Sequence, residues 1–413
     1  MEFVKSLLEG FKKGEMDRRE FFRKGAQLGL SATTLGFLLS HFDPTRNFEM
    51  AKAEAAEKKK KGGKIRVISI SIALEEPHLK KFHEDTGIQV EPTPASLSGM
   101  MNKFISGGFR TYDAIDENMS YMPVLWETGS LKPIPVDAIP NAKYLAEIWV
   151  DPKAPGNWLG WPMSQVYTDD TRKYFKCVPR FMNFEAFGFN TEKLPEDTRS
   201  YGALVDPKWA GRTAVWNDYS WTMSWVATYL KYNGKLSAKD VSDLDPKEVD
   251  KCMEFLTEKK KAGQFRAFWD DFGQIVNLMA SGEVWISDCW NPVIEAAKKS
   301  GFKGKYVNPL EGNRPWFHGI ALSKDSKNAD LVYEYANWSL EGWWAAQVTP
   351  TGWIPATMKA KDYLAKDVWD FWMEGKGRDT GAFVDRAKNV ACWPHWPKEA
   401  DYYLTKWLNF LAA

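Results

Sequence analysis

Short apolar runs alternate along most of the chain with longer segments whose apolar positions are spaced as in helices. Residues 65–72 form an apolar run typical of a buried strand, and Glu75-Glu76-Pro77 follows with proline at a helix start, where its missing N–H costs nothing. We expect this helix to end at Gly87, before a second strand over 88–90 and a third over 113–116. This order predicts mostly parallel strands joined by helices.

The second part of the chain continues the same alternation. Residues 184–190 change between the two faces of a strand with a period of two, and residues 213–216 form another strand that runs into a polar tip. Further along, the pattern predicts helices that begin at 245, 271 and 291, a strand over 283–287, and helices over 328–340 and 402–411. The chain therefore belongs to the α/β class.

The N-terminal segment has the composition of a targeting signal. Arg18 and Arg19 precede aromatic and basic residues, and a weakly apolar run over 26–42 is too short and too polar to remain in a bilayer as a permanent span. Ala51 and Ala53 fit an Ala-x-Ala cleavage site. The segment resembles a twin-arginine export signal, which implies export machinery for folded proteins as a partner. An amphipathic helix that happens to contain both arginines is the alternative, and cleavage after Ala53 stays open.

The charge and composition of the chain limit the classes of molecule that it can bind. The chain has 55 Lys and Arg against 54 Asp and Glu, a formal net charge of +1. No basic cluster of the kind that nucleic acids require stands out, because the Lys and Gly residues of 54–64 read as a solvated tether. We therefore expect no nucleic-acid partner.

The four cysteines do not form a metal motif. Cys177, Cys252, Cys289 and Cys392 include no C-x-x-C pair, which argues against a thiolate metal site. In an oxidising compartment one or two disulfides compete with buried free thiols, and the sequence leaves both open.

Residues 187–218 carry the most specific order of features. A strand ends at Asn190, a charged loop follows, the unit Asp-Pro-Lys-Trp-Ala-Gly-Arg occupies 206–212, and the strand over 213–216 comes next. This order resembles the extracellular solute-binding proteins of ABC importers, specifically the polyamine (spermidine/putrescine)-binding branch. The resemblance covers residues 65–411 and is weakest over 133–173. It implies the type II periplasmic binding fold, with two lobes joined by hinge crossings near 181–185, near 314–318 and after Ile354.

The resemblance also implies a domain organisation and a role. We predict an export signal over 1–53, a tether over 54–64, a first lobe from 65–183 plus 315–355, and a second lobe from 184–314 plus 356–413. The role is to capture a small organic solute, an amine or polyamine by preference, in an aromatic-lined cleft and to deliver it to a permease in the membrane. We expect a monomer in the periplasm or outside a prokaryotic cell, without a cofactor or a metal.

Candidate ligand contacts follow from the same comparison, in a chain with 21 tryptophans. Three aromatic residues and one carboxylate match ligand positions of the family, and other candidates lie beside them. The set comprises Trp290, Trp316, Trp353, Asp218, Trp221, His318, Asn118, Tyr121 and Arg180. Aromatic faces pack the methylenes of an alkylammonium ion and attract its charge, by about 0.5–2 kcal/mol each, while Asp218 is the candidate for holding the amine.

Two departures from the family pattern leave the solute open. His318 stands where the family has an aspartate, and Trp221 where it has a glutamate. A pocket with so few carboxylates would bury ammonium groups without partners, which is costly. The alternatives are a mono-cation such as a quaternary amine, an aromatic or carboxylate-bearing compound held by Arg180 and His318, or a sugar.

Catalytic motifs are missing from the sequence. It has no H-E-x-x-H, G-x-S-x-G, P-loop or G-x-G-x-x-G motif, so we expect no enzyme. A secreted carbohydrate-active enzyme remains the rival class, because tryptophans also stack on sugars. An iron(III)-binding relative would need converging tyrosines, and Tyr403 is expected in the core instead. The segment 392–396, Cys-Trp-Pro-His-Trp, is expected either to reach the cleft or to pack the last helix against the surface of the protein.

Overall fold

The computed structural model describes residues 62–375 and 383–413, together with residues 16, 20, 23 and 24. The predicted export signal with Arg18 and Arg19, and nearly all of the tether, lie outside the described residues. The chain divides into two compact units, Met1–Lys60 and Lys61–Ala413, and the second carries the fold. Within the described part of the chain, no helix combines the length and the apolar character needed to cross a membrane.

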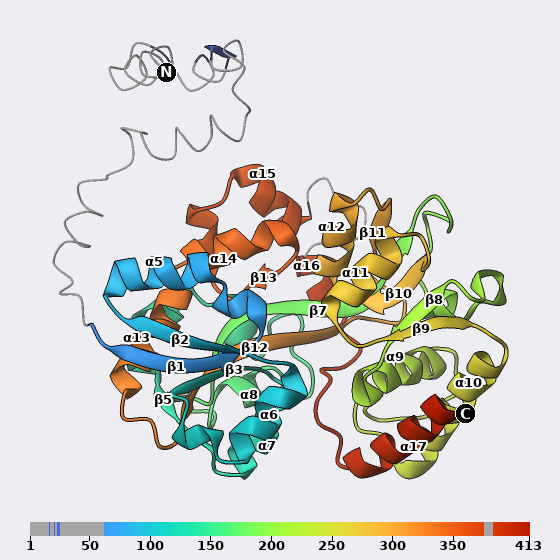
Figure 1. The fold of residues 1–413 in the computed structure, drawn as a ribbon, viewed down its shortest axis with the longest axis horizontal. Helices are drawn as coiled ribbons and strands as arrows, with labels where there is room; N and C mark the ends of the chain where they lie inside the picture. The colour runs from blue at the N-terminus through green and yellow to red at the C-terminus, as the bar shows by residue number, and fades with distance from the viewer. Residues whose placement is uncertain (1–15, 17–19, 21–22, 25–61, 376–382) are drawn as a thin grey trace. The chain divides into compact units, whose positions relative to one another are not determined.

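An 11-stranded sheet runs through the second unit, with its main path in the order β2-β1-β3-β12-β7-β10-β8-β9 (Figure 1), and two short strands form a separate sheet. At one end β1 pairs in parallel with both β2 and β3, and at the other end β8 pairs in parallel with both β9 and β10. The bounds are β1 Lys64–Ser69, β2 Gln89–Pro94, β3 Ala114–Asn118, β8 Thr213–Trp216, β9 Phe265–Trp269 and β10 Ile286–Cys289. We call β2-β1-β3 with its helices the first lobe, and β10-β8-β9 with its helices the second lobe.

Two long strands connect the lobes. β7 (Val178–Asn190) and β12 (Arg314–Ser323) pair antiparallel with each other, and β12 also pairs antiparallel with β3. From Ala186 onward β7 pairs instead with β10, and its end pairs with β11 (Gly304–Tyr306). The short β13 (Ile354–Pro355) pairs with β7 as well. We call β7 and β12 the crossing strands; they are antiparallel although the strands of each lobe are parallel.

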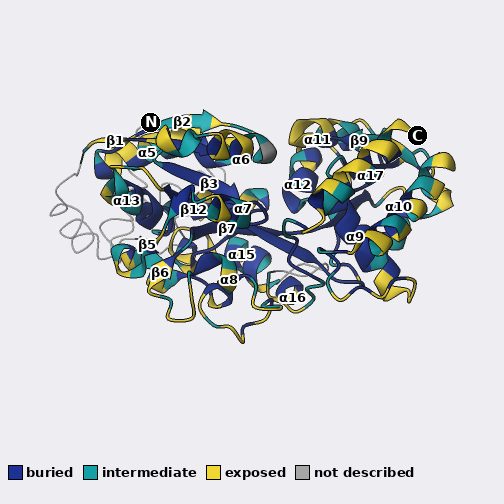
Figure 2. Ribbon diagram, turned by 90° about the horizontal axis from the view of Figure 1, so that it is seen from below, coloured by how far each residue is buried: buried dark blue, intermediate teal, exposed yellow. Residues whose placement is uncertain are grey.

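Helices cover both faces of the sheet in each lobe (Figure 1), and the inner strands β3, β12, β7, β10 and β8 are buried (Figure 2). The main helices of the first lobe are α5 Glu76–Thr86, α6 Leu97–Ile105, α7 Met122–Glu127, α13 Ala329–Ser339 and α14 Trp343–Val348. Those of the second lobe are α9 Tyr219–Tyr232, α10 Pro246–Lys261, α11 Phe272–Ala280, α12 Asn291–Lys299 and α17 Ala400–Ala412. Shorter elements are α8 Met163–Val166, α15 Lys366–Trp369, α16 Phe383–Ala387, β4 Leu131–Lys132, β5 Ile134–Pro135 and β6 Tyr174–Phe175.

Capping residues set several of these boundaries as the sequence predicts. Asp245 accepts hydrogen bonds from the N–H groups of Lys247 and Glu248, and the Glu248 side chain bonds back to the Asp245 N–H. This capping box satisfies donors at the start of α10 that would otherwise lack partners. α5 ends at Gly87, whose φ of 77° lies in the left-handed region that glycine adopts without strain.

One predicted strand of the second lobe is shifted, and one helix was not predicted. The strand predicted over 283–287 lies at Ile286–Cys289. After the polar residues Asn217 and Asp218 begins the 14-residue helix α9, most of whose residues are buried. A helix buried on nearly all sides has no polar stripe, so its sequence lacks the helical period.

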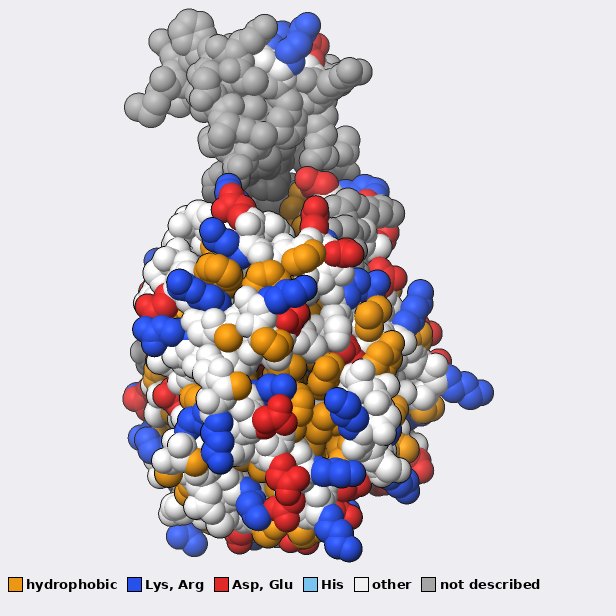
Figure 3. All heavy atoms as spheres, turned by 90° about the vertical axis from the view of Figure 1, so that its right-hand side faces the viewer, with side chains coloured by type: hydrophobic (Ala, Val, Ile, Leu, Met, Phe, Trp, Pro, Cys, Tyr) orange, Lys and Arg blue, Asp and Glu red, His pale blue; other side chains and the backbone are white. Residues whose placement is uncertain are grey.

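The four cysteines are free and buried, so neither disulfide alternative is formed. On the face of the molecule in Figure 3, acidic and basic side chains are interspersed without a basic cluster.

Candidate ligand-binding site

The crossing strands present three cross-strand pairs on one face of the sheet. His318 lies opposite Phe181, Trp316 opposite Asn183, and Arg314 opposite Glu185. Opposed residues of an antiparallel pair share a face, and every second residue returns to it. The six side chains therefore line one surface, which we call the hinge face.

Five tryptophans gather at this face and form what we call the tryptophan wall. The second lobe supplies Trp216, Trp269 and Trp290, with Trp216 and Trp269 stacked at 5.4 Å and Trp290 edge-on to both, at 5.0 and 5.5 Å. Trp316 of β12 continues the wall 6.3 Å from Trp290, and Trp353 follows 5.8 Å from Trp316. Trp290, Trp316 and Trp353, which the sequence places far apart, are thus brought together.

The loop before β13 is held close to the second lobe by a glycine. Gly352 has a φ of +98°, and a Cβ there would lie 3.2 Å from the backbone nitrogen of Pro292 in α12. Asn183 of the hinge face donates from Nδ2 to the Gly352 carbonyl at 2.9 Å. These contacts fix Trp353 beside Trp316.

Asp218 and Trp221 lie at the start of α9. Asp218 Oδ1 caps the helix by accepting from the N–H groups of Ser220 at 2.9 Å and Trp221 at 3.0 Å. Burial raises the pKa of Asp218, although these hydrogen bonds lower it in part. The buried Trp221 ring lies 5.8 Å from Trp216, so it extends the tryptophan wall.

The first-lobe candidates lie at the end of β3 and beside it. Asn118 Oδ1 accepts from the N–H and the hydroxyl of Ser120, so it shapes the turn after the strand. Tyr121 is buried one turn later. His318 pairs with Asn118 across the strands and stacks on Phe181 at 4.9 Å.

Arg180 lies at the irregularity in the pairing of β7 with β12 and is paired through one of its nitrogens. It is fully buried, donates to Asp116 Oδ2 at 2.7 Å and to the Tyr335 hydroxyl at 3.1 Å, and its guanidinium lies 3.9 Å from the centre of the Trp344 ring. Burial alone would raise the pKa of Asp116, but His318 and Arg180 outweigh it and lower that pKa. Arg180 pairs with Asp116 through Nη1, while its Nε and Nη2 atoms have no hydrogen-bond partner within the protein.

The sequence reasoning did not consider three buried carboxylates that lie near the candidate residues: Glu117, Glu185 and Asp288. Burial raises the pKa of Glu185 to about 8 and that of Asp288 to about 7, with Arg314 opposing the shift in both. Glu117, at the end of β3, has its pKa raised well above the ordinary value by burial. A signal in the sequence pointed to Glu185, because a charged residue is rare inside a buried strand. Glu185 lies within a 13-residue strand that is buried throughout.

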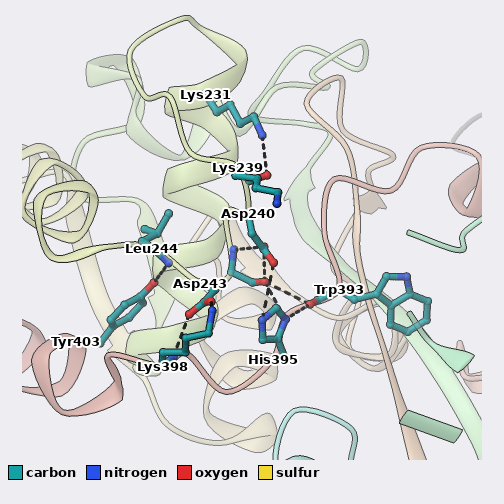
Figure 4. A network of polar contacts seen from close by, with 10 residues as sticks. Lys231, Lys239, Asp240, Asp243, Leu244, Trp393, His395, Lys398 and Tyr403 are labelled. Atoms are coloured by element: carbon teal, nitrogen blue, oxygen red, sulfur yellow. Dashed lines mark hydrogen bonds and ion pairs between the residues drawn. The ribbon is translucent and has the colours of Figure 1, made fainter. Parts of the chain in front are cut away.

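The segment 389–396, which we call the strap, touches both lobes. His395 stacks on Trp161 at 5.0 Å, and its Nδ1 lies 3.1 Å from Ser242 Oγ (Figure 4). The ring of Trp396 lies 5.5 Å from Tyr121 at the end of the first-lobe strand β3 and 6.3 Å from Tyr219 in α9 of the second lobe. The strap therefore lies between the lobes as well as beside the last helix.

Among the residues that the structure describes, no three His, Cys, Asp or Glu side chains are grouped so that they could hold a metal ion. Tyr403 is buried and its hydroxyl accepts from the Leu244 N–H at 2.7 Å (Figure 4). This contact is a core role, as the sequence predicted.

Two parallel half-sheets, joined by antiparallel crossing strands with an aromatic wall at the junction, define an α/β binding protein of the periplasmic type. The family model for bacterial extracellular solute-binding proteins matches residues 78–374. The chain belongs to this family.

Relatives support this assignment. The spermidine/putrescine-binding periplasmic protein 1 of Haemophilus influenzae is 25% identical over 297 residues, covering 70% of this chain and 74% of the relative. The putrescine/cadaverine-binding protein of Pseudomonas aeruginosa is 22% identical over 315 residues, covering 72% and 79%. Among solved structures, the spermidine/putrescine ABC transporter substrate-binding protein of Streptococcus pneumoniae matches with a TM-score of 0.67 at 17% identity, covering 85% of this chain and 99% of that one.

Three predictions from the sequence are confirmed by the family and the fold. The architecture is the α/β periplasmic binding fold. The protein binds a solute rather than catalysing a reaction, and it acts in the periplasm or outside the bacterial cell.

Proposed function

We propose that the protein is the solute-binding component of an ABC importer and that it captures an organic amine, of the polyamine class by preference, between its two lobes. The observation that carries the proposal is the tryptophan wall, which draws rings from the second lobe and from the strands that join the lobes. The names of the relatives, which refer to spermidine, putrescine and cadaverine, favour the same class of solute.

The chemistry of the wall suits an alkylammonium solute. Indole faces pack against methylenes and attract a cation by about 0.5–2 kcal/mol each, more when water is excluded. Trp290, Trp316 and Trp353 are the proposed cage, and Asp218, the N-cap of α9, is the proposed carboxylate for the amine. Arg180 acts indirectly, because it orders Asp116 and His318 behind the cage.

Entry of the solute requires the lobes to part. Trp316 is 4% exposed and Trp353 8% exposed, so their rings lie packed against their neighbours in the described conformation. We propose that β7, β12 and β13 act as the hinge and that solute contacts with both lobes favour the closed state. The lobe boundaries predicted from the sequence belong to this proposal.

The finer statements on export and assembly are also proposals. Residues 1–53 would direct the folded protein through the twin-arginine route, and the exported protein would act as a monomer beside its permease. Replacing both Arg18 and Arg19 with lysine should leave the protein in the cytoplasm, judged by cell fractionation. Export at the normal level would refute the twin-arginine assignment.

A thermal-shift screen of the whole chain tests the solute class. The panel contains putrescine, spermidine, a quaternary amine, an aromatic acid and an oligosaccharide. A solute present at 100 times its Kd stabilises the native state by about 2.7 kcal/mol. We expect the largest shift with a primary amine, recovered unchanged. A larger shift with the acid or the sugar would overturn the amine assignment, and hydrolysis of the sugar would favour the rival enzyme class.

A further inference from the structure

Three charged side chains meet at the point where β7 changes its pairing partner from β12 to β10. Glu185 faces Arg314 across the crossing strands, and Asp288 of β10 lies opposite Phe187, two residues along β7 from Glu185. All three residues are at most 1% exposed. We call Glu185, Arg314 and Asp288 the hinge cluster.

The hinge cluster has hydrogen-bonding capacity that the protein does not satisfy. Both carboxylate oxygens of Glu185, the Oδ2 atom of Asp288, and the Nε and Nη2 atoms of Arg314 have no partner. Arg314 is held elsewhere, because its Nη1 donates to the Trp221 carbonyl at 2.6 Å and to Ser224 Oγ at 2.8 Å. Buried polar atoms are nearly always paired, so the three vacant carboxylate oxygens indicate an occupant with hydrogen-bond donors.

The charge of the surroundings favours a cation as this occupant. Two carboxylates of the cluster face one guanidinium, and Asp218 adds a third carboxylate close enough to act on Glu185. The Trp290 indole also lies near enough to influence Glu185, although it makes no well-formed hydrogen bond to either oxygen. The cluster therefore adjoins the tryptophan wall. An ammonium group has three N–H donors, one for each vacant carboxylate oxygen, but no acceptor for the vacant Nε and Nη2 donors of Arg314.

We propose that Glu185 and Asp288 form a subsite that binds a primary ammonium group of the solute beside Trp290. This inference rests on the proposed function and narrows it: the solute carries a primary amine, because a quaternary ammonium has no N–H to donate. The distant end of a diamine or polyamine then extends along Trp316 and Trp353.

The subsite couples binding to protons. Burial raises the pKa of Glu185 to about 8 and that of Asp288 to about 7, so at neutral pH the empty subsite holds at least part of a proton. The charged groups around Glu185 are Arg314, Asp288 and Asp218. Three neutral groups, Tyr201, Tyr306 and Cys289, also lie near it, and burial raises the pKa of each.

An ammonium ion favours the ionised carboxylates and lowers their pKa. Binding therefore releases protons, and affinity rises with pH up to about 8 while an alkyl amine, with a pKa near 10, stays charged.

Calorimetric titration of the whole chain with putrescine tests the subsite, at pH 6, 7 and 8 and in buffers of different ionisation enthalpy. For the wild type we expect net proton release and an affinity at pH 8 about tenfold above that at pH 6. Glu185→Gln should weaken binding at pH 8 by about 10- to 100-fold and flatten the pH dependence. The permethylated diquaternary analogue of putrescine should bind the wild type more weakly than putrescine, and Glu185→Gln should weaken its binding less than that of putrescine, because it makes no hydrogen bond to Glu185.

Two further variants complete the design. Glu283→Gln is the matched control, because Glu283 is an exposed carboxylate paired with Arg266, and it should bind as the wild type does. Asp288→Asn keeps the oxygen that accepts from the Trp216 N–H and should weaken putrescine at least fivefold, which preserves the test if Glu185→Gln does not fold.

The possible results separate the two proposals. Two results would refute the subsite: binding of putrescine without proton release, or unchanged putrescine affinity in Glu185→Gln and Asp288→Asn. Either result would mean that the hinge cluster holds only water, and the proposed amine-binding function would still stand. Failure of the wild type to bind any amine would refute the proposed function itself.

Discussion

Trp316→Phe is the sharpest perturbation of the proposed cage. Trp316 lies in the middle of the tryptophan wall, with Trp290 at 6.3 Å, Trp353 at 5.8 Å and His318 at 5.8 Å. Its indole N–H has no hydrogen-bond partner, so phenylalanine removes ring area and π density without breaking a hydrogen bond within the protein. The substitution therefore tests contact with the solute rather than loss of a polar network.

The expected loss follows from the ring contacts. Tryptophan is the strongest cation–π partner at about 0.5–2 kcal/mol, and the smaller ring gives up part of this attraction together with some buried apolar area. We expect putrescine binding to weaken by about 1–2 kcal/mol, a Kd about 5- to 30-fold higher, measured by calorimetry at pH 8.

Trp149→Phe is the matched control. Trp149 is buried with an unpartnered indole N–H as well, but it packs against Phe317, on the opposite face of β12 from Trp316. Both variants should lose comparable stability in urea, while only Trp316→Phe should lose affinity. An unchanged Kd for Trp316→Phe, or an equal loss in Trp149→Phe, would refute the assignment of Trp316 to the cage.

Three other predictions concern the fold and the strap. Arg180→Met leaves Asp116 buried without its cation and should cost about 3–5 kcal/mol in urea unfolding at pH 7. Because the pKa of Asp116 is lowered, its contribution is present above the ordinary aspartate pKa of about 3.9 and is lost as the pH falls through the lowered value, so an equal cost at low pH would contradict this reading. Asp245→Ala should cost about 1 kcal/mol of stability with no change in putrescine affinity; an altered Kd would show that the cap does more than start α10. Trp396→Ala should raise the dissociation rate of putrescine severalfold in stopped-flow fluorescence, because the strap loses its contacts with both lobes, and an unchanged rate would make the strap a passive clip.

Sequence reasoning located elements with local signals and missed those whose surroundings decide their form. The strand Thr213–Trp216 and the cap at Asp245 follow from alternation and from capping chemistry. Helix α9 was missed because its burial on most sides removes the polar stripe that marks a surface helix. The antiparallel direction of β7 and β12 depends on long-range pairing, which no local pattern encodes.

At the candidate site, too, some residues could be predicted from local patterns, whereas the partners of others could not. The three tryptophans expected at ligand positions come together at the hinge face, because each lies beside a strand that the fold brings to the junction. The partners of charged residues could not be predicted: Arg180 is paired with Asp116, whereas Glu185 stands without a partner. Pairing depends on distances between strands far apart in sequence, and only the rarity of a charge inside a buried strand pointed to Glu185.

Titration calorimetry of the whole wild-type chain with putrescine at pH 8 tests the central claim most directly. Capture of an amine by two lobes that close over a tryptophan wall predicts one bound molecule per chain with a Kd of about 1 μM or tighter, equivalent to about 8 kcal/mol. A folded protein that shows no saturable binding of putrescine or spermidine at millimolar concentration would contradict the account.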